Sequence, residues 1–388
     1  MKTNWQTKKL GEICELQKIK NIKKDLPYIG LEDIESNTGK FIGSLMPKIV
    51  KSLTFYFNSE HILYGRLRPY LNKVLIPGFE GHCSTEIFPI KVRNNLDKKF
   101  LHHWLSYDEV VKKINNTCTG ARMPRANMKD VLNFPIPLPP LTEQHRIVKI
   151  LDEVFADVAK AKVNAEKNLQ NSKELFESYL QSFFANPGKD WEEKKLKEIG
   201  ITQTGTTPKT AEKENYGNFI PFIKPADVDF SGVGDIRYDN DGLSEIGLKK
   251  GRKMEKGSIL MVCIGATIGK VGFAERLVSS NQQINTLTVK DDLEPKFIYY
   301  AMTSKEFQGK VLSEGKGAQA TLPIINKSKW ENLTISYPFS KIKQKSIVSK
   351  LDSLSAETRK LETIYRQKLT GLEELKESVL KRAFNGDL

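Results

Sequence analysis

Two short segments each combine a pair of arginines with glycine and proline. They span residues 64–73 and 119–127. An arginine guanidinium recognises guanine through two parallel hydrogen bonds, and glycine and proline favour the tight turns that would hold it outward. These segments are therefore candidates for contacting nucleic-acid bases. The side chains concerned are Arg66, Arg68, Tyr70, Lys73, Arg122 and Arg125.

The second half of the chain offers amide and lysine side chains in comparable places. Asparagine and glutamine can bind adenine through two hydrogen bonds, whereas lysine ammonium groups neutralise phosphates regardless of base sequence. The candidates are Lys209, Lys270, Asn281, Gln282, Gln283, Lys316 and Gln319. For every candidate in both halves, the alternative is a structural role in which the side chain only holds its loop in shape.

The charge balance favours a polyanionic partner. The chain of 388 residues has 61 Lys and Arg against 47 Asp and Glu, a formal charge of +14. Residues 1–140 contain 22 bases and 13 acids, so they hold +9 of this excess, whereas residues 189–338, with 22 and 20, hold only +2. A basic face can neutralise phosphates. The alternative is a solvated surface of mixed charge.

Residues 265–271 resemble a phosphate-binding loop, but the match fails twice. Such a loop needs four residues between its glycines and a serine or threonine after the lysine. Here three residues separate Gly265 from Gly269, and Val271 follows the lysine. We expect a turn between two strands instead. Because no methyltransferase motif or dinucleotide-binding fingerprint occurs either, the sequence predicts that the chain is not itself an enzyme.

The remaining reactive residues show no arrangement typical of a site. The cysteines stand far apart, with no histidine at ligand spacing, which indicates reduced thiols and neither disulfides nor zinc ligands. They are Cys14, Cys83, Cys118 and Cys263. His102 and His103 are expected to be partly buried and not to form a ligand pair. The rival interpretation is a stand-alone nuclease or ATPase with divergent motifs, which metal- or ATP-dependent cleavage by the purified chain would reveal.

An internal repeat organises the elements that must position these residues. Residues 4–13 recur at 190–199, an offset of 186, and residues 142–188 recur at 342–388, where fourteen of 47 positions are identical. The sequence is therefore a tandem duplication of a unit of roughly 190 residues. Each unit begins with a part rich in glycine, proline and β-branched residues, which is typical of short strands and turns.

Each unit ends in a segment without interior proline, at 142–186 and 342–385, whose apolar residues recur every three or four positions. This spacing predicts two long helices, each about 65 Å at ~1.5 Å per residue, packed as an antiparallel pair. Phe155, Phe176, Phe183 and Phe184 are expected on the outer faces of the pair, available to a partner. The N-terminus lacks the apolar run of a secretory signal, and no apolar stretch reaches the ~18 residues of a membrane span, which predicts a cytoplasmic protein.

Over nearly its whole length the chain resembles the DNA-specificity subunits of type I restriction–modification enzymes. Residues 137–148 are similar to the family's lead into the first long helix. Two further sets of segments resemble two classes of target-recognition domain: 67–70 with 83–86, and 205–208, 222–224, 265–270 and 281–283. Residues 337–344 depart from the pattern, because they lack the double proline and the Glu-Gln pair found at 139–144. The resemblance therefore makes no prediction for the shape of this turn.

This resemblance implies an α/β (α+β) fold with two target-recognition domains, at 1–140 and 189–338. Residues 141–188 and 339–388 would be the spacer helices of an antiparallel coiled coil. It further implies that double-stranded DNA, two methyltransferase subunits and restriction (translocase–nuclease) subunits are the partners, and that each domain reads half of a split, asymmetric site. S-adenosylmethionine, ATP and magnesium would belong to the partner subunits, with no cofactor in this chain.

Overall fold

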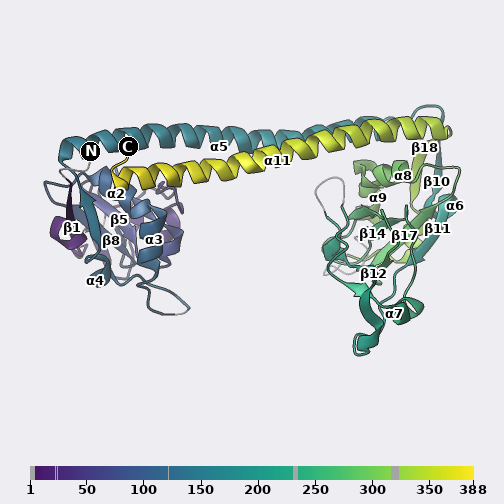
Figure 1. Cartoon of the computed structure of the whole chain (residues 1–388), viewed down its shortest axis with the longest axis horizontal. Coiled ribbons are helices and arrows are strands. Elements are labelled where there is room, and N and C mark those ends of the chain that lie inside the picture. The colour runs from purple at the N-terminus through teal and green to yellow at the C-terminus, as the bar shows by residue number, and fades with distance from the viewer. Residues whose placement is uncertain (1–4, 22, 24, 121, 230–234, 316–322) are drawn as a thin grey trace. The chain divides into compact units, whose positions relative to one another are not determined.

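The computed structural model describes residues 5–388 except 22, 24, 121, 230–234 and 316–322. The chain divides into two compact units. The first unit comprises Met1–Ala165 and Gln367–Leu388, and the second comprises Glu166–Arg366. Each unit therefore combines a mixed strand-and-helix domain with a segment of each long helix, and each is described here by itself (Figure 1).

The first unit is built on a four-stranded antiparallel sheet. Its order is β2 (Cys14–Leu16), β8 (Ile87–Val92), β5 (His61–Gly65) and β6 (Val74–Leu75). A second sheet has three strands in the order β3 (Tyr28–Ile29), β7 (Gly81–Ser84) and β4 (Thr54–Phe57). In addition, β1 (Gln6–Lys9) pairs with β9 (Pro135–Leu138). The helices are α1 (Leu10–Ile13), α2 (Lys98–Ser106), α3 (Asp108–Asn115) and α4 (Met128–Val131), with single 3-10 turns η1 (Leu31–Asp33) and η2 (Pro69–Leu71).

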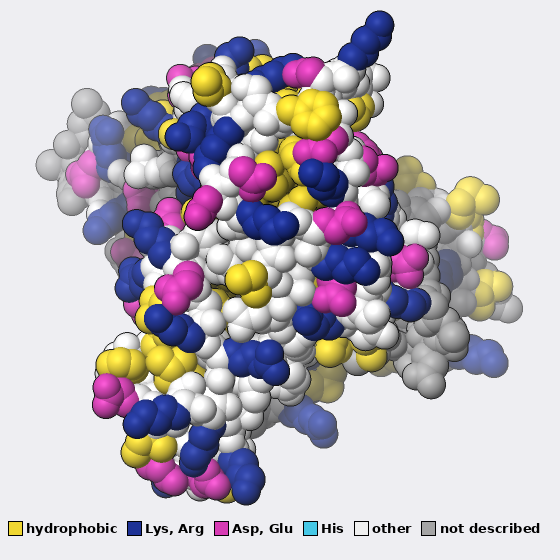
Figure 2. Space-filling view, turned by 90° about the vertical axis from the view of Figure 1, so that its right-hand side faces the viewer, with side chains coloured by type: hydrophobic (Ala, Val, Ile, Leu, Met, Phe, Trp, Pro, Cys, Tyr) yellow, Lys and Arg dark blue, Asp and Glu magenta, His cyan; other side chains and the backbone are white. Residues whose placement is uncertain are grey.

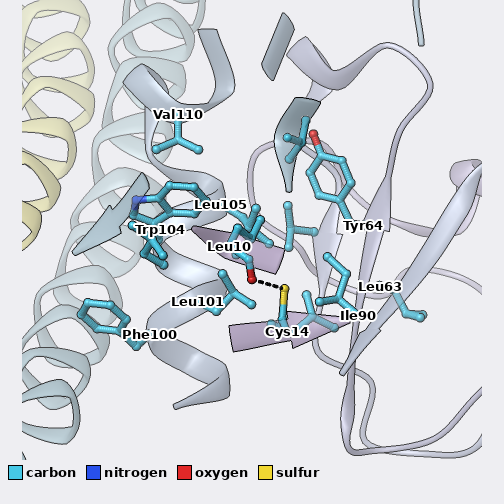
Figure 3. Packing of buried hydrophobic residues seen from close by; sticks show 14 of the residues in the cluster. Leu10, Cys14, Leu63, Tyr64, Ile90, Phe100, Leu101, Trp104, Leu105 and Val110 are labelled. Atoms are coloured by element: carbon cyan, nitrogen blue, oxygen red, sulfur yellow. Dashed lines mark hydrogen bonds between the residues drawn. The ribbon is translucent and has the colours of Figure 1, made fainter. Parts of the chain in front are cut away.

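Helix α2 covers the buried side of this sheet. Its N-terminus is capped by Asp97, whose carboxylate accepts a hydrogen bond of 2.9 Å from the backbone nitrogen of Phe100, as expected for an N-cap aspartate. Phe100 and Trp104 of α2 belong to the core that also contains Leu10 and Cys14 (Figure 3). The Cys14 thiol donates to the carbonyl oxygen of Leu10 at 3.2 Å, so the cysteine is a core residue.

The second unit repeats the main sheet with the same strand order. It consists of β11 (Gly200–Thr204), β17 (Ile284–Val289), β14 (Ile259–Val262) and β15 (Val271–Phe273), while β10 (Trp191–Lys195) pairs with β18 (Thr334–Pro338). The smaller sheet differs, since β12 (Tyr216–Ile223) joins β13 (Gly242–Leu243) to β16 (Ser279–Ser280). The helices are α6 (Leu196–Ile199), α7 (Glu245–Lys250), α8 (Pro295–Thr303), α9 (Lys305–Gly315) and α10 (Lys327–Glu331), with 3-10 turns η3 (Lys213–Asn215) and η4 (Pro225–Asp227).

Two long helices follow the two domains, as the apolar periodicity predicts. Helix α5 spans Leu141–Phe184 and α11 spans Lys341–Asn385, 44 and 45 residues. The helices pack side by side and run in opposite directions (Figure 1). In the first unit an ion pair of 2.7 Å between Lys162 Nζ and Glu373 Oε1 joins them. No helix of the described residues is long and apolar enough to cross a membrane.

The phenylalanines of α5 do not face outward, so the expectation of an open apolar helix face was wrong. Phe176 and Phe184 are 5% and 3% exposed and belong to the core of the second unit. Phe183 packs partly buried against the same core. In the first unit, the ring of Phe155 lies 5.3 Å from that of His103 on α2. The domains cover these faces of the helix because their own helices α2 and α8 pack against it.

Both long helices begin with the same side-chain lock. Gln144 is fully buried, and its amide nitrogen donates to the carbonyl oxygens of Pro139 at 2.8 Å and Asn95 at 3.0 Å. Gln344, equally buried, donates to the carbonyl of Pro338 at 2.8 Å. The turn before α11 is therefore equivalent to that before α5, although the double proline is missing.

Candidate nucleic-acid interface

Two of the predicted arginines meet on one carboxylate in the first unit. Glu86 Oε2 accepts a hydrogen bond of 3.0 Å from Arg66 Nε, and Glu86 Oε1 accepts one of 2.9 Å from Arg125 Nε. Arg66 directly follows β5, whereas Arg125 lies in the loop before α4. The Glu86 side chain is 21% exposed and those of the arginines 31% and 38%. A half-buried carboxylate thus joins two loops that are distant in sequence.

The backbone supports this arrangement. The backbone nitrogen of Arg66 donates to the Glu86 carbonyl at 2.9 Å, and that of Ala126 donates to the Arg66 carbonyl at 2.9 Å. The guanidinium carbon of Arg66 also lies 5.0 Å from the centre of the Phe88 ring, a distance at which a cation–π attraction contributes. The arginine is therefore fixed by a carboxylate, a ring and two backbone contacts.

The turn after Arg66 holds further predicted residues at the surface. Arg68 and Asn72 have left-handed backbone conformations, with φ of 51° and 46°, which non-glycine residues seldom adopt. The Arg68 nitrogen donates to the Pro124 carbonyl at 2.7 Å, so this turn is tied to the second arginine segment. The side chains of Arg68, Arg122 and Tyr70 are exposed, the last by 51%.

Lys73 is used differently from what its place in the segment predicts. Its ammonium group donates to the carbonyl oxygen of Leu31 at 2.6 Å and is only partly exposed. This contact ties η1 to the end of the turn. The geometry gives Lys73 a structural role, which was the alternative for every candidate in these loops.

The second unit has the same backbone frame with different side chains. The Cys263 nitrogen donates to the Gln283 carbonyl at 2.8 Å, as Arg66 does to Glu86. Gly265 donates to the Pro323 carbonyl at 3.1 Å, as Arg68 does to Pro124. The positions of Arg66, Glu86 and Arg125 therefore correspond to Cys263, Gln283 and Ile324.

The glycines that suggest a phosphate loop are part of this frame. Gly265 and Gly269 have φ of 109° and 90° and occupy the places of Arg68 and Asn72, which also have positive φ. The segment is a turn between β14 and β15, as the sequence predicts. Lys270 corresponds to Lys73, and its ammonium group donates to the Val228 carbonyl at 3.1 Å.

The described amide candidates of the second unit, at 281–283, differ in exposure. Asn281 is 8% exposed, and its amide nitrogen donates to Gln283 Oε1 at 2.9 Å. Gln282 is exposed, and its Oε1 accepts a hydrogen bond from the Thr207 hydroxyl. The exposed Lys209 ammonium lies 3.7 Å from Glu212 Oε1. Lys316 and Gln319 lie outside the described residues.

A basic hollow in the first unit was missed from the sequence. It has a volume of about 370 Å³, and no acidic side chain is among the described residues that line it. Its lysines are Lys20, Lys23, Lys48 and Lys51. The adjoining segment exposes large apolar side chains, with Met46 at 75% and Ile49 at 78%. The available signal was that residues 40–59 contain three lysines and no acid.

The hollow and the arginine cluster are linked through strand β7. Thr54, which lines the hollow, pairs with Ser84 in the β4–β7 ladder. Glu86 follows Ser84 by two residues. Thr85 and Glu86 form the turn between β7 and β8, so the strand that pairs with Thr54 leads directly into the residue that binds the two arginines. Figure 2 shows a different face of the molecule. There, basic side chains alternate with acidic ones and form no continuous basic patch.

The described residues contain no cluster of three or more His, Cys, Asp or Glu side chains that could hold a metal. His103 and Asp152 form a contact of 3.0 Å between Nε2 and Oδ1 where α2 meets α5. Burial lowers the pKa of His102 to about 4 and also lowers that of His103. The packing of α2 therefore disfavours the charged form of both imidazoles, which agrees with the partly buried role expected for them.

Known proteins share the sequence pattern. Residues 2–167 and 188–370 match the family described as the type I restriction modification DNA specificity domain. The EcoDI specificity subunit of Escherichia coli is 30% identical over 187 residues, 47% of this chain and 41% of that protein, so the match spans less than half of its length. The EcoBI specificity subunit of the same organism is 22% identical over 398 residues, 95% of this chain and 81% of that protein.

Solved structures share the fold. A chain from a study of complex assembly and conformational transition of the type I R-M system has a TM-score of 0.83 and 22% identity, covering 100% of this chain and 99% of that one. The HsdS subunit from Thermoanaerobacter tengcongensis has a TM-score of 0.63 and 21% identity, with 100% and 98% covered. The solved structures share the fold, and the family model matches both halves of the repeat. The chain therefore belongs to the type I restriction–modification DNA specificity family.

Proposed function

We propose that this chain is the sequence-recognition subunit of a type I restriction–modification complex and that each unit reads one half of a split, asymmetric double-stranded DNA site. The observation that carries the proposal is the shared frame: the same backbone contacts present Arg66 and Arg125 in one unit and Cys263 and Ile324 in the other. A common scaffold with different side chains at equivalent places suits two readers of different sequences.

The basic hollow supports a role for the first unit in phosphate contact. The hollow is lined by four lysines and no acidic side chain among the described residues, although Lys23 also pairs with Glu80 outside the lining at 3.3 Å. These lysines would supply the sequence-independent part of DNA affinity. The arginines bound to Glu86 would then supply the sequence-dependent part. This division of labour separates contacts that position the duplex from contacts that read it.

The assembly is part of the same proposal. Two methyltransferase subunits would dock on the chain, and restriction subunits would join that core. S-adenosylmethionine, ATP and magnesium would be bound by those partners, and the chain would carry no catalytic group of its own. No described side-chain cluster favours the rival interpretation of a stand-alone nuclease or ATPase.

Mapping methylated bases across the genome tests the proposal, in cells with and without this chain and with the host's methyltransferase subunit present in both. We expect a two-part motif with an unspecified gap that depends on the chain. Loss of Arg68 or Arg122 should change one half of the motif only, and loss of Gln282 the other half only. Methylation that is independent of the chain, or a continuous motif, would contradict the proposal.

A further inference from the structure

Glu86 occupies an unusual place for an acidic residue in a basic domain. It lies 20 residues from Arg66 and 39 from Arg125, yet its two carboxylate oxygens each accept one Nε hydrogen bond. The three side chains together carry one net positive charge. A carboxylate that is 21% exposed and shared by two guanidinium groups does not repel a phosphate backbone as an unpaired one would.

The orientation of the two guanidinium groups matters more than their charge. Glu86 binds Nε of each arginine, which leaves the two terminal nitrogens of Arg66 without a partner among the described residues. Nη1 of Arg125 is 3.4 Å from the Met123 carbonyl, while its Nη2 has no partner among those residues. The terminal nitrogens are the pair that an arginine uses end-on to bind guanine O6 and N7.

We propose that Glu86 is the positioning residue of the first half-site reader: it holds Arg66 and Arg125 so that their terminal nitrogens meet guanine in the major groove. This inference rests on the proposed function. Long arginine side chains lose considerable rotamer entropy when they bind. A carboxylate that fixes them before DNA arrives removes part of that cost, which makes the base contact more favourable.

The second unit provides the contrast that limits the inference to one half-site. Gln283 stands where Glu86 does, and Cys263 and Ile324 stand where the two arginines do. Gln283 Oε1 accepts instead from the Asn281 amide. The carboxylate clamp therefore has no counterpart among the described residues at this position of the second unit, and a change at Glu86 should leave the second half-site untouched.

The test replaces Glu86 by glutamine in the full chain, co-purified with the host's methyltransferase subunit, and selects binding sites from a randomised duplex DNA pool. Glutamine keeps the shape, but its NH₂ is a donor and cannot accept from a guanidinium, so at least one arginine is released. We expect E86Q to reduce guanine preference at one or two positions of one half-site by about fivefold or more, within the 5- to 150-fold range of a bidentate arginine–guanine pair.

The control is E60Q. Glu60 stands just before β5, at the opposite end of that strand from Arg66, and pairs with Lys91 at 3.0 Å; this variant should select the wild-type sequence. R66K and R125K should reproduce the E86Q preference, because lysine keeps the charge without the fork. Retained preference at the other positions of the first half-site reports that the first unit of each variant is folded, and the second half-site reports the same for the second unit.

Each outcome decides the matter. Unchanged base preference in E86Q would overturn the inference while the proposed function stands. Equal loss at every position of the first half-site would also overturn it, because Glu86 would then only stabilise the domain. A wild-type complex that enriches no two-part sequence would defeat the proposed function itself.

Discussion

The side-chain oxygen of Gln144 accepts a hydrogen bond of 2.7 Å from the backbone nitrogen of Asp97. Through this contact the first turn of α5 reaches the N-terminus of α2, whose cap is the same aspartate. Gln344 makes the equivalent contact of 2.8 Å with the backbone nitrogen of Glu294, at the start of α8. In both units one buried amide therefore fastens the long helix to the domain that precedes it.

Replacing Gln144 by alanine should destabilise the first unit by about 1–3 kcal/mol, because the buried Pro139 carbonyl loses its partner. The backbone groups of Asn95 and Asp97 also lose a partner, but these residues are not buried and water can replace it. Hydrogen exchange of the α2 amides in the full chain measures this, and we expect faster exchange there than in the second unit. Gln170 on the same helix is the control, because its amide donates to the exposed side chain of Glu174 and to no backbone group of another element among the described residues. Equal protection in Q144A and Q170A would show that the lock contributes nothing.

The lysines of the basic hollow should act through phosphates. In the complex with methyltransferase subunits, K48A and K51A should each lower the slope of log K against log salt concentration by about 0.9, with the same weakening for every DNA sequence. Lys112 pairs with Asp108 on the surface of α3 and serves as the matched control, since K112A should leave the slope unchanged. A change in base preference without a change in slope would exclude the phosphate role.

Acid should weaken the first unit before the second. Burial lowers the pKa of His102 from 6.5 in the unfolded chain to about 4 in the fold. Protons therefore bind the unfolded state more tightly, and the stability that is present above pH 6.5 is lost as the pH falls toward 4. His102 contributes up to ~1.4 kcal/mol per pH unit across that window, and the lowered pKa of His103, also caused by burial, acts in the same direction.

All five histidines lie in the first 145 residues, so the second unit is an internal control. Hydrogen exchange between pH 6.5 and 5 should show stability falling in the first unit and staying nearly level in the second. H102Q should reduce the slope. A parallel decline in both units, unaffected by this substitution, would assign the effect to other groups.

The long helices were predictable because their signal is local. Apolar spacing placed them at 142–186 and 342–385, within two residues of the observed ends of α5 and α11. The clamp on Glu86 was not, because it depends on contacts between residues distant in sequence: the β5–β8 pairing brings Arg66 to Glu86, 20 positions away, and the bridge between Leu67 and Arg125 brings in Arg125. The correspondence of the two loops was missed for a related reason: Arg68 and Gly265 both have positive φ but have no side-chain chemistry in common.

The last prediction concerns α5 and α11 as a spacer between the half-sites. Inserting four residues after Ala165 and four after Arg366, where both helices cross from one unit to the other, adds ~6 Å of rise and rotates each helix by ~40° beyond a full turn. The apolar seam stays nearly in register, so the helix pair can still form. Because base pairs advance ~3.4 Å, the same two half-sites should be read with one or two more base pairs between them.

Two-residue insertions at the same places rotate the seam by ~200° and should instead abolish assembly. Sequencing of methylated sites decides between the possibilities: an unchanged gap, or altered bases within either half-site, would show that the helices do not set the spacing.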